Sequence, residues 1–287
     1  MRWQRGHRSQ NVEDRRRSPV TRSAGIGLGG LALMAVISLL MGQNPVTVLM
    51  QLLGAATQGG GVTASAPISE AELAAQEESY SFVSFILDDT QKTWREILPA
   101  AGASYQDARL VVFRNATESA CGLGQAAMGP FYCPGDQQVY IDLAFYDDLK
   151  ERFGAPGDFA QAYVVAHEIG HHVQNILGVE QQMREAQRRN PSQANQLSVL
   201  LELQADCLAG LWGHSAARRG LLEAGDLEEG LNAAAAIGDD RIQKQQSGRV
   251  SPESFTHGSS AQRVQWLRRG LEAGTVEACD TFSGNGR

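Results

Sequence analysis

The sequence predicts an α+β fold that is mostly helical with a small sheet and that follows one N-terminal transmembrane helix. Three features indicate this architecture: an uncharged apolar run near the N-terminus, two short strand-like segments in the first half, and four long helical patterns in the second half. A long helix, a small sheet and then further helices follow one another in the order typical of α+β domains.

Composition and charge exclude several classes of protein. The chain has 287 residues, of which 43% are hydrophobic and 20% charged, so neither a disordered nor a collagen-like protein is expected. The net charge is −7, but residues 1–22 hold seven arginines against Glu13 and Asp14, a local charge of +5 that leaves −12 for the remainder. Because an acidic surface repels phosphate, we expect no nucleic-acid partner.

The apolar run at residues 24–42 predicts a transmembrane helix. Its nineteen residues contain no strongly polar side chain except Ser38. As a helix they extend about 28 Å, which is close to the thickness of a bilayer core. We therefore expect the lipid bilayer to be one partner of the chain.

The basic residues around this run predict its orientation. No Lys or Arg follows it before Lys92, whereas four arginines lie shortly before it: Arg15, Arg16, Arg17 and Arg22. The positive-inside rule then places residues 1–23 in the cytoplasm as a basic N-terminal segment. The rest of the chain is expected to be extracytoplasmic, on a single-pass membrane protein.

Residues 43–68 predict an interfacial segment followed by a flexible linker, and residues 69–287 an extracytoplasmic domain. The apolar stretch 46–56 is too short to span a bilayer, and the Gly- and Ser-containing stretch after it is typical of a tether. A cleaved signal peptide is the alternative interpretation of the N-terminus. The anchor is favoured because a polar segment more than twenty residues long precedes the apolar run, which is itself longer than a usual signal core.

Within the domain, periodicity and capping residues predict the elements. A helix is expected from Ser69 to Pro99, and strands at 109–113 and 138–143, with Val139, Ile141 and Leu143 on one face of the second strand. Four further helices are each expected to begin at a capping Asp or Ser: 158–177, 192 to about 214, 226 to about 245, and 259 to about 272.

The four cysteines favour disulfides in an oxidising compartment. Of the three connectivities, the simplest joins Cys121 to Cys133 and Cys207 to Cys279. A cysteine zinc site is the alternative, and the lack of any Cys-x-x-Cys spacing argues against it.

His167, Glu168 and His171 form an His-Glu-x-x-His motif within the helical pattern 158–177. Four residues advance a helix by about 400°, so both imidazoles leave from nearly the same face and can bind one metal ion. Glu168 lies about 100° away from His167, at the edge of that face, where its carboxylate can act as a general base on a metal-bound water. The motif therefore predicts a Zn²⁺ site for hydrolysis, and a solvated helix face is the alternative.

Glu202 and Asp206 lie four residues apart on a second helical pattern that is otherwise apolar. Carboxylates on an apolar face need partners or a metal ion. We expect Glu202 to be the third zinc ligand and Asp206 to accept a hydrogen bond from the second nitrogen of a ligand histidine. The reverse assignment of the two carboxylates stays open.

Several long stretches resemble a known family. These are MRWQRG at the start, MGPFYCPGDQQVYIDLAFYDDL, DFAQAYVVAHEIGHHVQ, ELQADCLAGLWGHS, GDLEEGLNAAAAIGDDR and SFTHGSSAQR. They are similar to the bacterial neutral zinc metallopeptidases, single-span membrane proteins. More broadly, the motifs resemble the gluzincins, in which a Glu from an E-x-x-x-D helix completes the site. The resemblance implies a zincin-like domain that hydrolyses peptide or protein substrates, with an edge strand, here residues 138–143, that binds the substrate backbone.

The stretch Thr256-His257-Gly258-Ser259, with Arg263, resembles the Thr-His-Pro-Ser segment of membrane-associated gluzincins, although Gly258 replaces the proline. The resemblance implies that His257 stabilises the oxyanion or acts as a displaceable fourth metal ligand. A histidine that merely precedes a helix cap is the alternative. His172 is expected to pack or face solvent, and His214 to lie at a helix end.

Two alternative interpretations of the sequence are proteins without hydrolytic activity. One is a catalytically inactive zinc-binding scaffold of the same fold, and the other is an anchored helical interaction module without metal. Glu168 favours the enzyme, because a carboxylate beside the ligands is needed for hydrolysis but not for holding zinc. The sequence does not indicate the substrate or the oligomeric state.

Overall fold

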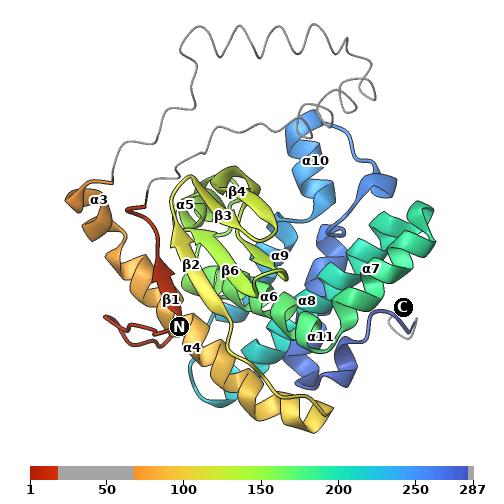
Figure 1. Cartoon of the computed structure of the whole chain (residues 1–287), viewed down its shortest axis with the longest axis horizontal. Coiled ribbons are helices and arrows are strands. Elements are labelled where there is room, and N and C mark those ends of the chain that lie inside the picture. Colours follow the sequence, from red (N-terminus) through yellow and green to blue (C-terminus); the bar gives the residue numbers. More distant parts are fainter. Residues whose placement is uncertain (19–67, 284–287) are drawn as a thin grey trace, which may run out of the picture. The chain divides into compact units, whose positions relative to one another are not determined.

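The computed structural model describes residues 1–18 and 68–283 (Figure 1). Met1–Arg16 and the described residues from Ser69 onward belong to one compact unit. The predicted transmembrane helix at 24–42 and all of the predicted linker at 43–68 except Ile68 lie outside the described residues. None of the described helices combines the length and the apolar character that crossing a membrane requires.

A four-stranded sheet lies beside the helices, with the strand order β1-β2-β6-β5. β1 (Val12–Asp14), β2 (Arg109–Phe113) and β6 (Gln138–Asp142) run parallel, and β5 (Phe131–Cys133) is antiparallel to β6. A separate hairpin consists of β3 (Ala116–Ser119) and β4 (Gly122–Gln125). The domain is therefore mostly helical α+β with small sheets, as the sequence predicts.

The two faces of the sheet bury different side chains, as the alternation in β6 predicts. Val139 and Ile141 join the main core together with Leu110 and Val112 of β2. Tyr140 lies in a second cluster with Val111, Phe113 and Cys133, and its ring stacks on Phe131 at 4.8 Å. Both faces are buried, which is the usual condition of parallel strands.

The position of β6 differs from the expectation. The resemblance implied that residues 138–143 form an edge strand, but β6 is paired on both sides, with β2 and with β5. β5 lies at the edge instead, because the chain turns after Cys133 and returns as β6. The Asp136 carboxylate stabilises this turn by accepting hydrogen bonds from the Gln138 amide (3.3 Å) and the Tyr140 hydroxyl (2.8 Å).

The first predicted helix is divided into two. α3 (Glu70–Ala75) begins at the Ser69 capping box, and α4 (Glu77–Ile97) continues from it and is followed by the 3-10 turn Leu98–Ala101. Apolar residues of α4, among them Phe82, Ile86 and Leu87, pack into the main core. The Ser69 cap is the helix start that the sequence predicts.

The remaining helices are α5 (Phe145–Glu151), α6 (Asp158–Ile176), α7 (Val179–Arg189), α8 (Ala194–Arg218), α9 (Asp226–Ala236), α10 (Asp239–Ser247) and α11 (Ser260–Ala273). The expected helix at 226–245 is two helices, separated at Gly238. Glycines, not aspartates, cap α6 and α9, whereas Ser259 forms the expected capping box before α11. α8 begins after Ser192 and extends beyond His214, so that histidine is not at a helix end.

Small residues let α6, α8 and α11 approach closely. A Cβ atom on Gly170 of α6 would lie 3.0 Å from the Ala205 carbonyl oxygen of α8. A Cβ on Gly270 of α11 would overlap the backbone of Cys207, and one on Gly210 of α8 would overlap that of Leu267. These contacts bring three helices together where the candidate site lies.

Both disulfides have the pairing that the sequence favours. Cys121 is bonded to Cys133 and Cys207 to Cys279. The first ties the β3–β4 hairpin to β5, and the second ties α8 to the C-terminal 3-10 turn Glu277–Cys279. Such bonds are typical of an oxidising, extracytoplasmic compartment.

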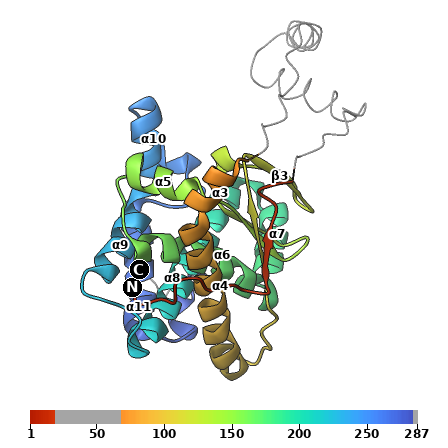
Figure 2. The same ribbon diagram turned by 90° about the vertical axis from the view of Figure 1, so that its left-hand side faces the viewer.

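The N-terminal segment packs on the body. The arginine distribution predicts a separate cytoplasmic segment at residues 1–23, whereas Met1–Arg16 belongs to the same compact unit as the body. Figure 2 shows this segment running across α4 to the sheet. The difference arises because β1 completes the parallel sheet through backbone hydrogen bonds to β2, which charge patterning alone does not reveal.

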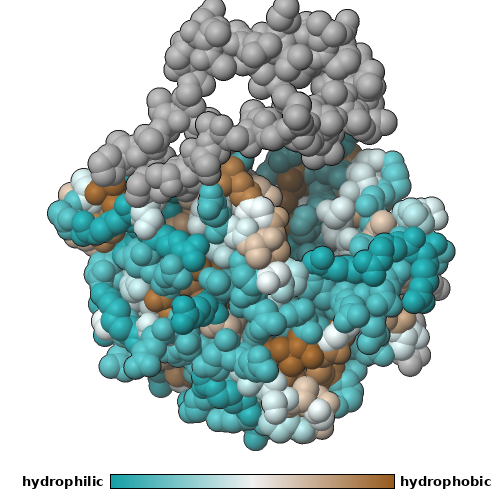
Figure 3. All heavy atoms as spheres, viewed as in Figure 1, coloured by the Kyte–Doolittle hydropathy of each residue, from teal (hydrophilic) through white to brown (hydrophobic). Residues whose placement is uncertain are grey.

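The face of the molecule in Figure 3 is mostly hydrophilic, with small and separate hydrophobic patches. Among the described residues, few large apolar side chains are exposed: Leu123, Met128, Leu227, Val250 and Phe282. Scattered exposed apolar residues of this kind are normal for a folded domain.

Because α8 and α11 approach closely, we expect alanine at position 270 to destabilise the protein although alanine favours helix formation. Gly270→Ala should lower the free energy of unfolding by about 1–3 kcal/mol, because the new methyl group overlaps the Cys207 backbone. Helix propensity alone would favour Ala by about 1 kcal/mol. Urea unfolding measures the difference, with Gln265→Ala on the exposed face of α11 as the control. A Gly270→Ala variant as stable as the parent would contradict the crossing.

Candidate metal centre

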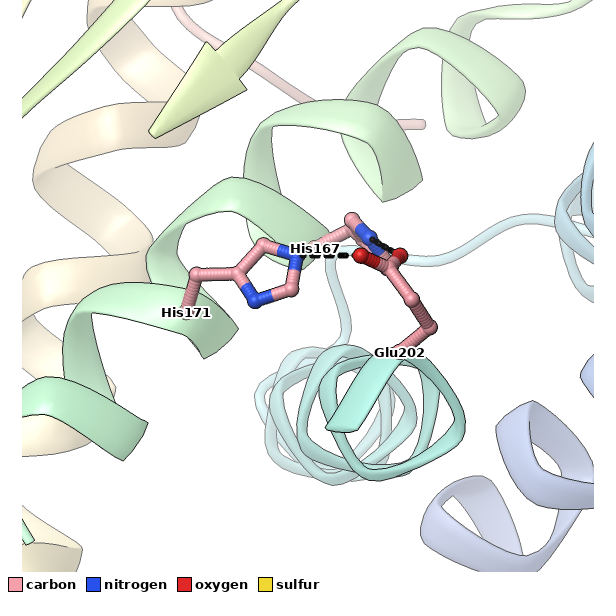
Figure 4. A group of neighbouring side chains, drawn as sticks. All are labelled: His167, His171 and Glu202. Atoms are coloured by element: carbon pink, nitrogen blue, oxygen red, sulfur yellow. Dashed lines mark hydrogen bonds and ion pairs between the residues drawn. The ribbon is translucent and has the colours of Figure 1, made fainter. Parts of the chain in front are cut away.

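His167 and His171 of α6 and Glu202 of α8 converge on one point (Figure 4). One potential ligand atom from each residue lies within 4.8 Å of the others. The Glu202 carboxylate is 3.2 Å from His167 Nε2 and 3.6 Å from His171 Nε2. Ligand atoms around a tetrahedral zinc ion are about 3.3 Å apart, so the donor set fits zinc both in chemistry and in spacing.

Each histidine is held by its other ring nitrogen. His167 Nδ1 lies 2.9 Å from Asp206 Oδ1, and His171 Nδ1 lies 2.8 Å from Gln174 Oε1. The Gln174 amide also donates to the Leu201 carbonyl oxygen at 2.7 Å, which fixes the side chain between α6 and α8. Partners of this kind select the tautomer that leaves Nε2 available for a metal ion.

The Asp206 carboxylate is completely buried and is bound by side chains of two other helices, α6 and α11. Arg263 of α11 donates to both of its oxygens at 2.9 Å, and the Tyr163 hydroxyl of α6 donates at 2.5 Å. Arg263 also donates to the Tyr163 oxygen at 3.0 Å. A buried charge needs such partners, and here they fix the residue that orients His167.

Glu168 follows His167 and is 8% exposed. No described residue donates a hydrogen bond to its carboxylate, so the group is available for a proton transfer. Burial raises the pKa of Glu168, and the charges of His167 and His171 partly oppose this effect. A carboxylate with a raised pKa beside a metal centre has the properties of a general base.

The charges in the centre are strongly coupled. Burial alone would lower the pKa of His167, but its hydrogen bonds to Asp206 and Glu202 outweigh burial and raise the pKa to about 10. Burial would raise the pKa of Glu202, yet the two histidines hold it well below its usual value. In the absence of metal, the proton on His167 and the Glu202 carboxylate therefore stabilise each other.

His257 lies in the loop before α11, and its side chain is 53% exposed. Asp239 Oδ2 accepts hydrogen bonds from the backbone amides of Thr256, His257 and Gly258 at 2.7, 2.7 and 3.1 Å, and Oδ1 lies 3.2 Å from His257 Nδ1. The hydrogen bond to Asp239 raises the pKa of His257, and the charge of Glu202 adds to this effect. Asp239 of α10 therefore holds the loop, and His257 is close enough to Glu202 for the carboxylate charge to affect its pKa.

Two other histidines form hydrogen bonds with groups outside the candidate centre. His172 is fully buried, with Nδ1 3.0 Å from the Tyr132 hydroxyl and Nε2 2.7 Å from the Gln106 carbonyl oxygen. His172 therefore packs in the interior rather than facing solvent, which is one of the two expected outcomes. His214 lies 2.9 Å from the Leu271 carbonyl oxygen.

Sequence reasoning missed the role of Gln174 and the contacts of Tyr163 and Arg263. Gln174 follows His171 by three residues, a spacing that places both side chains on one face of α6 and was a usable signal. Tyr163 precedes His167 by four residues, on the same face. The contact of Arg263 with Asp206 joins residues 57 positions apart, and no local pattern indicates it.

A second acidic group, formed by Asp158, Asp226 and Glu229, also has spacing compatible with a metal ion. The Met1 amine forms ion pairs there, at 2.8 Å to Asp158 and 3.3 Å to Asp226. A cation is already present in this group, so we do not assign it a metal.

Comparison with known proteins identifies the family. The profile of a family described as "Putative neutral zinc metallopeptidase" matches residues 1–282. The chain belongs to this family. The matched residues include the N-terminal segment as well as the body.

Two relatives illustrate the similarity. A protein of Escherichia coli K12, named "Uncharacterized protein YpfJ", is 49% identical over 292 residues, covering 98% of this chain and 99% of the relative. A protein of Mycobacterium tuberculosis H37Rv, named "Uncharacterized protein Rv2575", is 42% identical over 201 residues, covering 66% of each chain. No solved structure matches the chain significantly.

Zinc binding should release protons at neutral pH. The pKa of His167 is raised to about 10 in the metal-free protein, so at pH 7 this ring is protonated and must lose its proton to bind zinc through Nε2. Titration calorimetry in buffers of different ionisation enthalpy should show release of at least one proton per zinc ion. An enthalpy that does not depend on the buffer would contradict this ligand set.

Gln174→Ala should weaken zinc binding about 10- to 100-fold, because His171 loses the group that orients its ring. Competition with a chromogenic chelator measures the affinity. Gln182→Ala, at an exposed position of α7, is the matched control and should bind zinc like the parent. Equal affinities of the two variants would show that Gln174 does not position the ligand.

Proposed function

We propose that this chain is a zinc-dependent metallopeptidase that hydrolyses peptide bonds. The observation that carries the proposal is the convergence of His167, His171 and Glu202, each histidine presenting Nε2 toward the carboxylate. Three protein ligands leave a fourth position for water or substrate, which is the arrangement of catalytic zinc sites. Membership of a zinc metallopeptidase family agrees with it.

The side chains divide the work of hydrolysis. Zinc, when bound, would lower the pKa of a water molecule and polarise the substrate carbonyl group. Glu168 accepts the proton of that water and later delivers it to the leaving amine, which requires a carboxylate near the ligands that is not itself a ligand. Asp206 and Gln174 hold the imidazole rings in position throughout.

We propose that β5, rather than β6, receives the substrate backbone. Among the described residues β5 pairs with β6 on one side only, so its other edge is available to an extended peptide. The Tyr132 hydroxyl of β5 accepts a hydrogen bond from Asn175 (3.2 Å) and lies 3.0 Å from His172 Nδ1, both on α6. These contacts hold the edge strand against the helix that carries the metal ligands.

His257 is the proposed stabiliser of the oxyanion. Its raised pKa keeps the ring protonated, and therefore a hydrogen-bond donor, up to a higher pH than an ordinary histidine. The Asp239 carboxylate neutralises that charge and anchors the loop, which limits the freedom that Gly258 gives to the backbone. An imidazolium in this position would stabilise the negative charge that develops on the substrate oxygen.

The proposed location is extracytoplasmic. Two disulfides support it, because such bonds form and persist in oxidising compartments. The transmembrane prediction for residues 24–42 adds contact with a bacterial inner membrane. A peptide or protein of the cell envelope is then the expected substrate.

Glu168→Gln should abolish peptide cleavage while stoichiometric zinc is retained, because the variant loses the proton acceptor but no ligand. Cleavage of an unstructured protein such as casein and elemental analysis of the purified protein measure the two properties. Zinc without cleavage in the parent protein would indicate the inactive scaffold instead. Undiminished cleavage by the variant would reject Glu168 as the base.

A further inference from the structure

The N-terminal segment is bound to the body along its whole length. The Arg2 amide donates to the Leu221 carbonyl oxygen at 2.7 Å, and the Trp3 ring packs edge-on against Phe82 of α4 at 5.1 Å. Farther along the segment, His7 Nε2 and the Ser9 hydroxyl lie 2.8 and 2.6 Å from the Asp88 carboxylate.

The last part of the segment is a strand of the sheet. In β1, Val12 pairs with Leu110 and Asp14 with Val112. Backbone hydrogen bonds flank the pairing, from the Leu110 amide to the Asn11 carbonyl oxygen at 2.9 Å and from the Arg15 amide to the Val112 carbonyl oxygen at 2.7 Å. Parallel pairing requires direct contact of the two backbones, so residues 11–15 and β2 occupy the same compartment.

Three arginines of the segment form ion pairs with acidic side chains of the body. Arg2 pairs with Glu223 at 3.5 Å, Arg5 with Glu78 at 3.2 Å, and Arg8 with Glu77. Arg15 and Arg16 pair with Glu13 and Asp14 of their own segment. Each exposed pair contributes little stability, but three of them place basic side chains of the segment against acidic side chains of the body. These arginines complement the folded body, which is a different role from marking a cytoplasmic end.

The segment ends next to the point where the described chain resumes. Arg16 is 7% exposed, and its guanidinium lies 4.7 Å from the centre of the Tyr80 ring and 3.4 Å from Gln76 Oε1. Gln76 and Tyr80 are at the junction of α3 and α4, a few residues after Ser69. Arg16 and the junction of α3 and α4 thus lie side by side on the body.

We propose that the N-terminal segment and the disulfide-bonded body lie on the same extracytoplasmic side of the membrane. A single crossing between residues 16 and 69 would place the two parts on opposite sides of an apolar core about 30 Å thick, which is incompatible with β1 pairing to β2. The same-side arrangement replaces the single-pass topology that the arginine distribution predicts. The inference rests on the packing of the segment and on the two disulfides, and it does not depend on zinc binding or catalysis.

Cysteine labelling tests the topology. Gln10→Cys, in the N-terminal segment, and Gln182→Cys, on α7, each place one free thiol at an exposed position. The four native cysteines are disulfide-bonded and should not react. Spheroplasts that express either full-length variant are treated with a membrane-impermeant maleimide before or after permeabilisation, with a cytosolic thiol protein as the control for leakage.

Both thiols should label before permeabilisation. Protection of Gln10→Cys alone would overturn the proposal, because the segment would then lie in the cytoplasm while the body lies outside. Protection of both thiols would overturn the extracytoplasmic compartment.

A stability measurement tests the packing independently. Trp3→Ala in the purified full-length protein should lower the Tm by roughly 4 °C or more, because the body loses an aromatic contact in its core. Gln4→Ala, at the neighbouring exposed position, is the matched control and should leave the Tm unchanged. A Trp3→Ala variant with the parental Tm would show that the segment is not part of the folded body, and would overturn the proposal.

Discussion

The buried ion pair between Asp206 and Arg263 is the interaction on which the rest of the centre depends. It joins α8 to α11, and through the Tyr163 hydroxyl and His167 Nδ1 it also reaches α6. Burying two charges costs free energy that their attraction only partly recovers, so such a pair is weak evidence for stability. Its effect is geometric: His167 is correctly oriented only when three helices are docked together.

The backbone is adapted to this requirement. Gly170 lies against the Ala205 backbone, and Gly210 and Gly270 allow α8 and α11 to touch. The disulfide between Cys207 and Cys279 begins one residue after Asp206 and fixes the same part of α8 to the C-terminal turn. Close helix contact and a covalent bond therefore constrain the few residues whose displacement would separate the proposed metal ligands.

The sheet has a comparable division of functions. β1 and β5 are its two edge strands, and Tyr132 holds β5 against α6. The N-terminal segment supplies one edge strand, and the other is the strand proposed to receive the substrate. The N-terminal segment thus belongs to the fold, in keeping with the family match that begins at residue 1.

The sequence by itself determined the elements and residues that follow local rules. The spacing of His167 and His171 fixes both imidazoles on one helix face, the Ser69 and Ser259 caps fix two helix starts, and the alternation in β6 fixes its buried faces. Only the tertiary structure decided which strand lies at the edge, which side chain neutralises Asp206, and where the N-terminal arginines pair. These depend on contacts between residues far apart in the chain, such as Arg263 with Asp206 and Val12 with Leu110, for which periodicity and charge patterning provide no signal.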